Sequence, residues 1–238
     1  MSQQVRIEGT WPSPITISRG WSRAQARPWN ADTADGFLRL ERGGQDFLAA
    51  ATNSLGGFGA ENVHSPALYP NSTRIWIRTG YEEKHRLGVM ERSLSRAIEP
   101  PKNPLSDIPP DWDLVSALDG AAFEGFWRMG VDGLKEAIKA TTHADILTQQ
   151  AESGLVGYVI VGAQSGVAYL QRIAVHPDHR GKGIGSDLVR GAINWARRRT
   201  SQVMVLNVRN ENAPARSLYS KEGFAPTGTQ LRILSHAL

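Results

Sequence analysis

A glycine-rich loop with two basic residues lies between a predicted strand and a predicted helix; it reads Arg180-Gly181-Lys182-Gly183-Ile184-Gly185. The apolar run 169–175 and a turn at residues 176–178 precede it, and an amphipathic run that ends in three arginines at 197–199 follows it. Glycines leave loop amides uncovered, and a helix N-terminus adds positive potential. The side chains of Arg180 and Lys182 add full charges. We therefore expect this loop to bind a phosphorylated ligand.

Two common phosphate-binding patterns do not fit this loop. The sequence has no Gly-x-x-x-x-Gly-Lys-Ser/Thr run of a Walker loop. The last glycine spacing of a dinucleotide fingerprint differs from that of Gly181-x-Gly183-x-Gly185. A third pattern, Arg/Gln-x-x-Gly-x-Gly/Ala after a strand ending in Ala-Val-His-Pro, fits at every position.

A second segment, residues 212–224, predicts a short capped helix after a buried strand at 203–208. Asn212 is a good N-cap, and Pro214 falls in the first turn, where its missing N–H costs nothing. Tyr219 shares one helical face with neighbouring apolar residues. Gly223 favours a left-handed residue after the helix, which lets Phe224 fold back onto it.

With these two motifs in this order and separation, residues 113–238 resemble the GCN5-related N-acetyltransferases (GNAT family). The resemblance implies an α/β (α+β) fold whose mixed, mostly antiparallel sheet is flanked by helices. It also implies acetyl-CoA as co-substrate, with its pyrophosphate on the glycine loop. The residues that the resemblance assigns to cofactor binding are Ile173, Ala174, Val175, Arg180, Gly181, Lys182, Gly183, Ile184, Gly185 and Asn212.

The implied reaction is transfer of an acetyl group to a primary amine by direct attack on the thioester. A backbone amide of Ile173 or Val175 would polarise the carbonyl, which requires a bulge or splay in the strand. By similarity, Tyr219 would protonate the departing thiolate, as a general acid does. In residues 72–81, which parallel residues 215–224, Trp76 stands where Tyr219 lies and has no phenol that could donate a proton.

The motifs say less about the groove that would bind the acceptor amine, and they do not identify a general base. The acceptor, a small-molecule or peptide amine, would lie in a groove lined by Tyr169, Gln171, Asn207, Phe123 and Trp127, none of which is a convincing base. Asp119 and Glu124 could project into this groove, although a solvated helix face also explains them. A water relay or an amine that arrives neutral would also serve. The alternative function is a non-catalytic acyl-CoA-binding sensor or regulatory module, against which the phenol of Tyr219 argues.

The front half of the chain reads as a degenerate copy of the back half. A segment with five prolines, 99–112, predicts a stiff linker between an accessory or degenerate GNAT-like domain at 1–98 and the catalytic GNAT domain at 113–238. Residues 72–81 parallel 215–224, and residues 87–94 parallel 231–238. This arrangement is similar to tandem acetyltransferases such as mycothiol synthase. Because the front loop is shortened to residues 42–44, we expect the front half to be catalytically inert.

The amino-acid composition argues against several classes of partner and ligand. The formal net charge is +4 and is shared evenly by the two halves, which argues against nucleic acid as a partner. No apolar run approaches the roughly 20 residues of a membrane span, and the N-terminus has no apolar signal core, so we expect a cytoplasmic protein that binds no membrane. The chain has no cysteine, and its six histidines lack metal-ligand spacing, so we expect no metal. We expect a monomer or a homodimer.

Overall fold

The computed structural model describes residues 4–108 and 111–238, and the chain divides into two compact units. The N-terminal unit extends to Leu87 and includes residues 230–238, and the C-terminal unit comprises residues 88–229. Each unit thus contains residues from both halves of the sequence. Of the predicted segments, residues 1–3 of the front domain and residues 109–110 of the linker lie outside the described residues.

The C-terminal unit contains a sheet with the strand order β6-β10-β9-β8-β7. The pairs β7–β8 and β8–β9 are antiparallel, and β9–β10 is parallel. Its elements in chain order are part of β6 (Glu82–Ser93), α3 (Trp112–Ala122), a 3₁₀ turn (Gly125–Trp127), α4 (Val131–Lys139), β7 (His143–Ala151), β8 (Gly154–Gln164), β9 (Val167–Val175), a 3₁₀ turn (Pro177–His179), α5 (Ile184–Arg198), β10 (Val203–Arg209), α6 (Ala213–Lys221) and the start of β11 (Ala225–Ala237).

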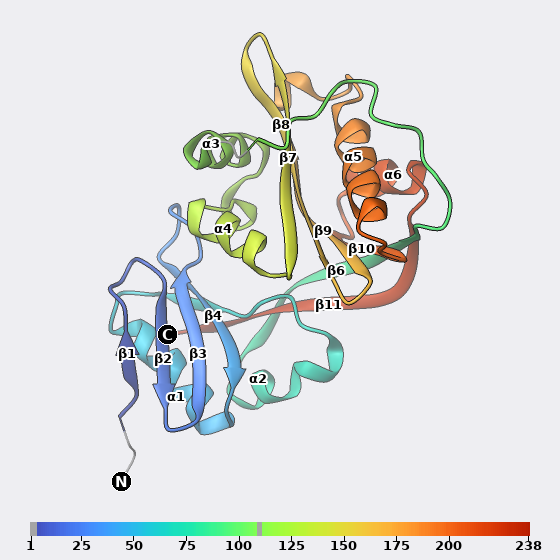
Figure 1. The fold of residues 1–238 in the computed structure, drawn as a ribbon. Coiled ribbons are helices and arrows are strands. Elements are labelled where there is room, and N and C mark those ends of the chain that lie inside the picture. The colour runs from blue at the N-terminus through green and yellow to red at the C-terminus, as the bar shows by residue number, and fades with distance from the viewer. Residues whose placement is uncertain (1–3, 109–110) are drawn as a thin grey trace. The chain divides into compact units, whose positions relative to one another are not determined.

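Helices cover both faces of this sheet, because its strands carry apolar side chains on both faces. On one face, Leu188 and Trp195 of α5 pack on strand residues that include Val159. On the other face, α3 and α4 supply Leu118 and Leu134 to a separate apolar cluster. Figure 1 shows α3 and α4 on one side of β7, β8 and β9, and α5 on the other.

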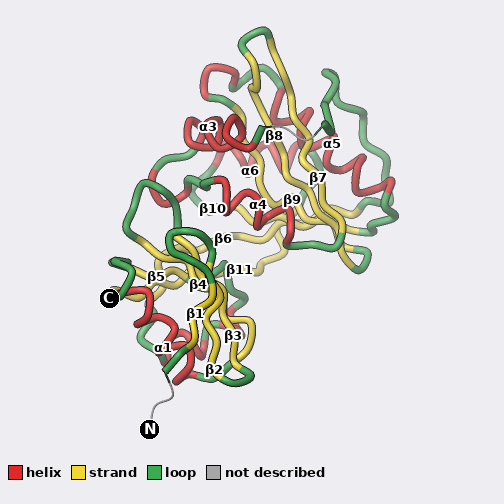
Figure 2. The backbone as a smooth tube through the Cα atoms, turned by 60° about the vertical axis from the view of Figure 1, so that its left-hand side comes forward, coloured by secondary structure: helices red, strands yellow, loops and turns green. Residues whose placement is uncertain are grey.

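The N-terminal unit contains a sheet with the order β1-β2-β3-β4-β5-β11. Antiparallel neighbours β2, β3 and β4 run side by side (Figures 1 and 2), β4–β5 is parallel, and β5–β11 is antiparallel. Its elements are β1 (Arg6–Glu8), β2 (Ile15–Arg19), β3 (Ser22–Pro28), β4 (Asp35–Arg42), α1 (Gln45–Gly56), β5 (Asn62–His64), a 3₁₀ turn (Pro70–Ser72), α2 (Arg74–Arg78), the start of β6 and the end of β11.

The two halves of the sequence repeat one arrangement, as the sequence parallels predict. Trp76 in α2 packs edge-on against Tyr81 at 4.8 Å, and Tyr219 in α6 packs edge-on against Phe224 at 5.9 Å. In each case a glycine with positive φ follows the helix, Gly80 at +90° and Gly223 at +86°. The backbone amides of Tyr81 and Phe224 donate to the carbonyls of Trp76 and Tyr219. The helix endings are therefore equivalent.

The strand that follows each of these helices is exchanged between the units. After α6, β11 pairs with β5 of the N-terminal unit, where Ser235 lies opposite His64. After α2, β6 precedes β10 in the strand order of the C-terminal unit. The parallel between residues 87–94 and 231–238 thus marks two strands that serve opposite units.

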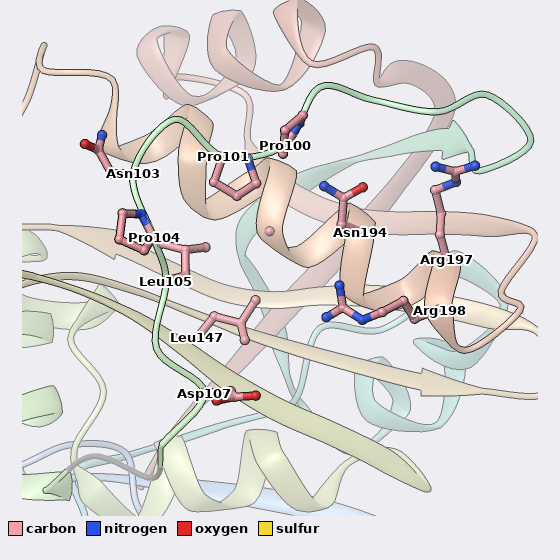
Figure 3. Close-up of a pocket in the computed structure, with 11 residues that line it drawn as sticks. Pro100, Pro101, Asn103, Pro104, Leu105, Asp107, Leu147, Asn194, Arg197 and Arg198 are labelled. Atoms are coloured by element: carbon pink, nitrogen blue, oxygen red, sulfur yellow. The ribbon is translucent and has the colours of Figure 1, made fainter.

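The proline-rich segment, here residues 99–108, is extended and fastened to the C-terminal unit. The buried carboxylate of Asp187 in α5 accepts hydrogen bonds from the backbone amide of Lys102 at 2.7 Å and from Nδ2 of Asn103 at 2.7 Å. Ser106 exchanges backbone hydrogen bonds with Thr148 of β7 at 2.9 and 2.8 Å. Figure 3 shows the segment running along α5, beside a cavity of about 670 Å³. The cavity is lined by residues of both, among them Pro100, Pro101, Pro104, Leu105, Asn194, Arg197 and Arg198.

Candidate functional site

The glycine loop has the backbone geometry that an anion site requires. Gly181 has φ +77° and Gly183 has φ +86°, and at both positions the space where a Cβ would stand is open. Gly183 is the N-cap of α5, so the first amides of the helix lack intrahelical acceptors and point out of its end. Gly185 has a different reason to be glycine, because a Cβ there would lie 3.0 Å from Leu218 of α6. The loop thus combines exposed amides with a helix N-terminus.

Strands β9 and β10 separate beside this loop. Their pairing covers only Val167 to Tyr169 on β9. Opposite β8, Leu170 and Arg172 are consecutive partners, so Gln171 is the extra residue of a bulge. The amide of His176 donates to Val156 of β8. Because strand amides alternate in direction, those of Ile173 and Val175 face the gap that β10 leaves.

A cavity of about 590 Å³ joins the loop, the strand gap and α6. Among the residues predicted to bind the cofactor, it brings together Ile173, Ala174, Val175, Arg180, Gly181, Gly183, Ile184, Gly185 and Asn212, and it includes Tyr219 and Phe123. The predicted residues outside its lining are Lys182, Tyr169, Gln171, Asn207 and Trp127. Residues that the sequence reasoning missed include His179, Ser186, Arg209, Pro214 and Lys221.

Tyr219 lies on the inner face of α6, with 5% of its surface exposed. The helix begins as predicted, with Asn212 Oδ1 accepting from the amide of Ala215 at 3.1 Å and Pro214 in the first turn. Burial raises the pKa of Tyr219 to about 12, against a smaller lowering by the positive charge of Arg172. The phenol therefore keeps its proton at neutral pH. Among the described residues its hydroxyl has no hydrogen-bond partner.

Asp119 occupies a place that the sequence reasoning did not foresee. The expectation of a solvated helix face is wrong for this residue, which is fully buried. Its Oδ2 accepts from Nε of Arg172 at 2.7 Å and from the hydroxyl of Tyr158 at 2.5 Å, and its Oδ1 accepts from the amide of Met129 at 2.7 Å. Because its oxygens already accept these hydrogen bonds, the carboxylate of Asp119 has a structural role. Glu124 lies beyond the end of α3 and is exposed.

Arg172 links this carboxylate to the aromatic side chains after α3. Its Nη2 donates to Asp119 at 2.8 Å and to the carbonyl of Trp127 at 2.7 Å, and its guanidinium lies 3.7 Å from the ring centroid of Phe123. Arg209 lies 4.9 Å from the ring centroid of Trp127. We call Phe123, Trp127, Arg172 and Arg209 the aromatic wall. Alternation along β10 could have identified Arg209, which stands two residues after the predicted Asn207.

Residues 4–108 and 111–238 contain no group of three or more His, Asp or Glu side chains that could hold a metal ion. No helix within the same ranges is long and apolar enough to cross a membrane.

His176, which the sequence places next to the loop, caps the turn 177–179 by accepting from the amide of Asp178.

Comparison with known proteins finds acetyltransferases. The sequence profile of the acetyltransferase (GNAT) family matches residues 112–224. The putative ribosomal protein bS18-alanine N-acetyltransferase of Bacillus subtilis is 28% identical over 118 residues, which are 50% of this chain and 77% of that protein. The mycothiol acetyltransferase of Saccharomonospora viridis is 28% identical over 197 residues, which cover 71% of this chain and 63% of that protein.

A solved structure extends the comparison to the front half. A tandem GNAT protein from the clavulanic acid biosynthesis pathway superposes with a TM-score of 0.63 and 14% identity, over 99% of this chain and 84% of that one. At this identity the match concerns the fold alone. It confirms the predicted α/β architecture with a mixed, mostly antiparallel sheet flanked by helices.

Proposed function

The chain belongs to the acetyltransferase (GNAT) family and is an acyltransferase, and we propose that it moves an acetyl group from acetyl-CoA to the primary amine of an acceptor. The observation that carries this proposal is the gap between β9 and β10. It opens onto one cavity that also contains the glycine loop and Tyr219. In this reaction the glycine loop would bind the phosphates of CoA, the strand amides would polarise the thioester carbonyl, and the protonated phenol would supply a proton to the leaving thiolate.

The residues fit the cofactor in three respects. The loop amides near Gly181 and Gly183 and the N-terminus of α5 would hold the pyrophosphate. The side chain of Arg180 donates to the carbonyl of Ala122 at 3.0 Å, which fixes the loop against the end of α3. The amide of Ile173 or Val175 would donate to the thioester oxygen and stabilise its negative charge in the transition state.

In the proposed reaction the neutral amine attacks the carbonyl carbon from the acceptor side. A C–N bond forms, the C–S bond breaks, and the sulfur takes a proton from Tyr219 Oη. The new amide nitrogen releases a proton to solvent, and the phenolate recovers one. No residue is assigned as general base, because Asp119 is held by Arg172, Tyr158 and the Met129 amide.

The proposal is tested by calorimetric titration with acetyl-CoA and with CoA, followed by an assay of amine-dependent thiol release. One site per chain, together with thiol release that requires an amine, supports the proposal. Failure to bind either ligand overturns it. Binding without transfer to any of a broad set of amines would favour the sensor instead.

A further inference from the structure

Arg209 differs from Arg172 and Arg180 in that its guanidinium has no ion-pair or hydrogen-bond partner among the described residues. It lines the cavity at the end of β10 and is partly buried. Its guanidinium lies over the face of Trp127, and within the described residues its side chain forms no ion pair or hydrogen bond, whereas its backbone carbonyl accepts from the amide of Asn212. Arg172 is paired with Asp119, and Arg180 donates to Ala122. The donors of Arg209 therefore stay available to a ligand.

The direction of this side chain separates it from the phosphate loop. Met204, Leu206 and Val208 of β10 pack into the cluster that contains α5. Because strand side chains alternate, Arg209 points to the opposite face, toward the connection between α3 and α4 that carries Trp127. The glycine loop forms the N-terminus of α5, on the first face. Arg209 thus stands on the side from which an acceptor would reach the strand gap.

The aromatic wall is fixed before any ligand arrives. Arg172 holds the Trp127 carbonyl and stacks on Phe123, and Asp119 anchors Arg172 from a fully buried position. The Trp127 face orients the Arg209 guanidinium without using its N–H donors. A planar guanidinium held in this way can donate two parallel hydrogen bonds to a carboxylate.

We propose that Arg209 binds the carboxylate of the acceptor, so that the acceptor is an amine of the amino-acid class. This inference rests on the proposed function, because it names the acceptor of the same site. It assigns specificity to a residue that does not take part in bond making. Loss of Arg209 is expected to affect acceptor choice and to leave acetyl-CoA affinity unchanged.

The experiment compares L-amino acids with their carboxamides as acceptors, for example leucine with leucinamide and phenylalanine with phenylalaninamide. The amine of a carboxamide is less basic, so more of it is neutral at a given pH, and a preference for the carboxylate cannot arise from amine ionisation. We expect kcat/KM to favour the carboxylates by about 10- to 100-fold, the range for a hydrogen bond between charged groups. Arg209→Met should abolish this preference, and Arg209→Lys should retain part of it.

The control is Arg198→Met, which removes one positive charge from the exposed end of α5, outside the catalytic cavity. It should keep the preference. Equal rates for both acceptor classes in the wild type, or an unchanged preference in Arg209→Met, would overturn the proposal. So would a tenfold loss of acetyl-CoA affinity in Arg209→Met, which would assign the side chain to the cofactor. Acetyl-CoA binding with acetylation of carboxamides alone would refute Arg209 but leave the proposed function standing, whereas no acetyl-CoA binding would refute the function itself.

Discussion

Replacing Tyr219 by phenylalanine tests the proposed general acid by removing one oxygen atom. The ring is 5% exposed and packs on Phe224, and its hydroxyl has no hydrogen-bond partner among the described residues. Tyr219→Phe therefore leaves no buried polar group unpaired. We expect the free energy of unfolding to change by less than about 1 kcal/mol and the acetyl-CoA Kd to change by less than about threefold.

The expected loss of rate follows from the acidity of the phenol. A positioned general acid contributes about 10²–10⁴ in rate. Burial raises the pKa of Tyr219 to about 12, well above the value of about 8.5 for a thiol. Proton transfer to the departing sulfur is thus uphill, which places the effect at or below the lower end of that range. We expect kcat to fall by about 10- to 100-fold, measured as thiol release at saturating acetyl-CoA.

Tyr81→Phe is the matched control, because Tyr81 is also buried but its hydroxyl lies 2.7 Å from Thr52 Oγ1 in the N-terminal unit. This variant should lose about 1 kcal/mol of stability and keep its kcat. An unchanged kcat in Tyr219→Phe would remove Tyr219 as the acid. An equal fall in both variants would show that the loss reflects packing.

The same pKa has a consequence for stability at high pH. The folded-state pKa of Tyr219, about 12, lies above the unfolded value of about 10. Its contribution is therefore fully present below pH 10 and is lost as pH rises toward 12. Wild type should lose up to about 2–3 kcal/mol more than Tyr219→Phe across this interval, by urea denaturation. Parallel losses in the two proteins would contradict the raised pKa.

Three further substitutions test the parts that surround the reaction. Gly183→Val should abolish acetyl-CoA binding in calorimetry, whereas Gly166→Val, at a similar φ of +78° in the β8–β9 turn, should retain it; equal affinities would refute the loop assignment. Asp119→Ala leaves the guanidinium of Arg172 buried without its counter-ion and should cost about 3–5 kcal/mol by urea denaturation, so a loss below about 1 kcal/mol would contradict the role of the pair. Asp187→Ala removes one anchor of the proline-rich segment and should speed proteolysis within residues 99–108; an unchanged cleavage rate would show that the contacts with Thr148 and Arg190 hold the segment without Asp187.

The sequence predicted those parts of the site that depend on local backbone rules. The loop, the N-cap at Asn212 and the positive φ at Gly223 each follow from residues that are adjacent in the chain. The bulge needed on β9 was predicted from the chemistry, and it lies at Gln171. Roles that depend on distant partners were not predicted. Asp119 meets Arg172 across 53 positions, so no spacing rule could distinguish it from a solvated helix residue.

The exchange of strands was beyond prediction for a related reason. Residues 87–94 and 231–238 have similar apolar alternation, so either could pair beside either β5 or β10. The strand that pairs at each place is the one whose apolar side chains pack into the hydrophobic core of that unit. Leu234 packs into the N-terminal core, whereas Met90 and Leu94 pack into the C-terminal core. Similarity between two segments identifies equivalent strands but does not say which unit each one completes.

The divergence of the two halves is best understood at the first turn of each loop helix. After the N-cap Gly183, the third helical residue of α5 is Ser186, which lines the cavity. After the N-cap Gly44, the third residue of α1 is Phe47, which is 2% exposed and lies 2.7 Å from the point where a Cβ of Gly43 would stand. Both helices carry an aspartate in the first turn, but Asp187 of α5 is buried and accepts hydrogen bonds from Lys102 and Asn103, whereas Asp46 of α1 is exposed and its negative charge repels a phosphate. An aromatic ring packs against the front loop, and a carboxylate lies at the start of its helix. Replacing Trp76 by tyrosine would therefore not restore a cofactor site, because the phosphates of the cofactor could not bind at this loop.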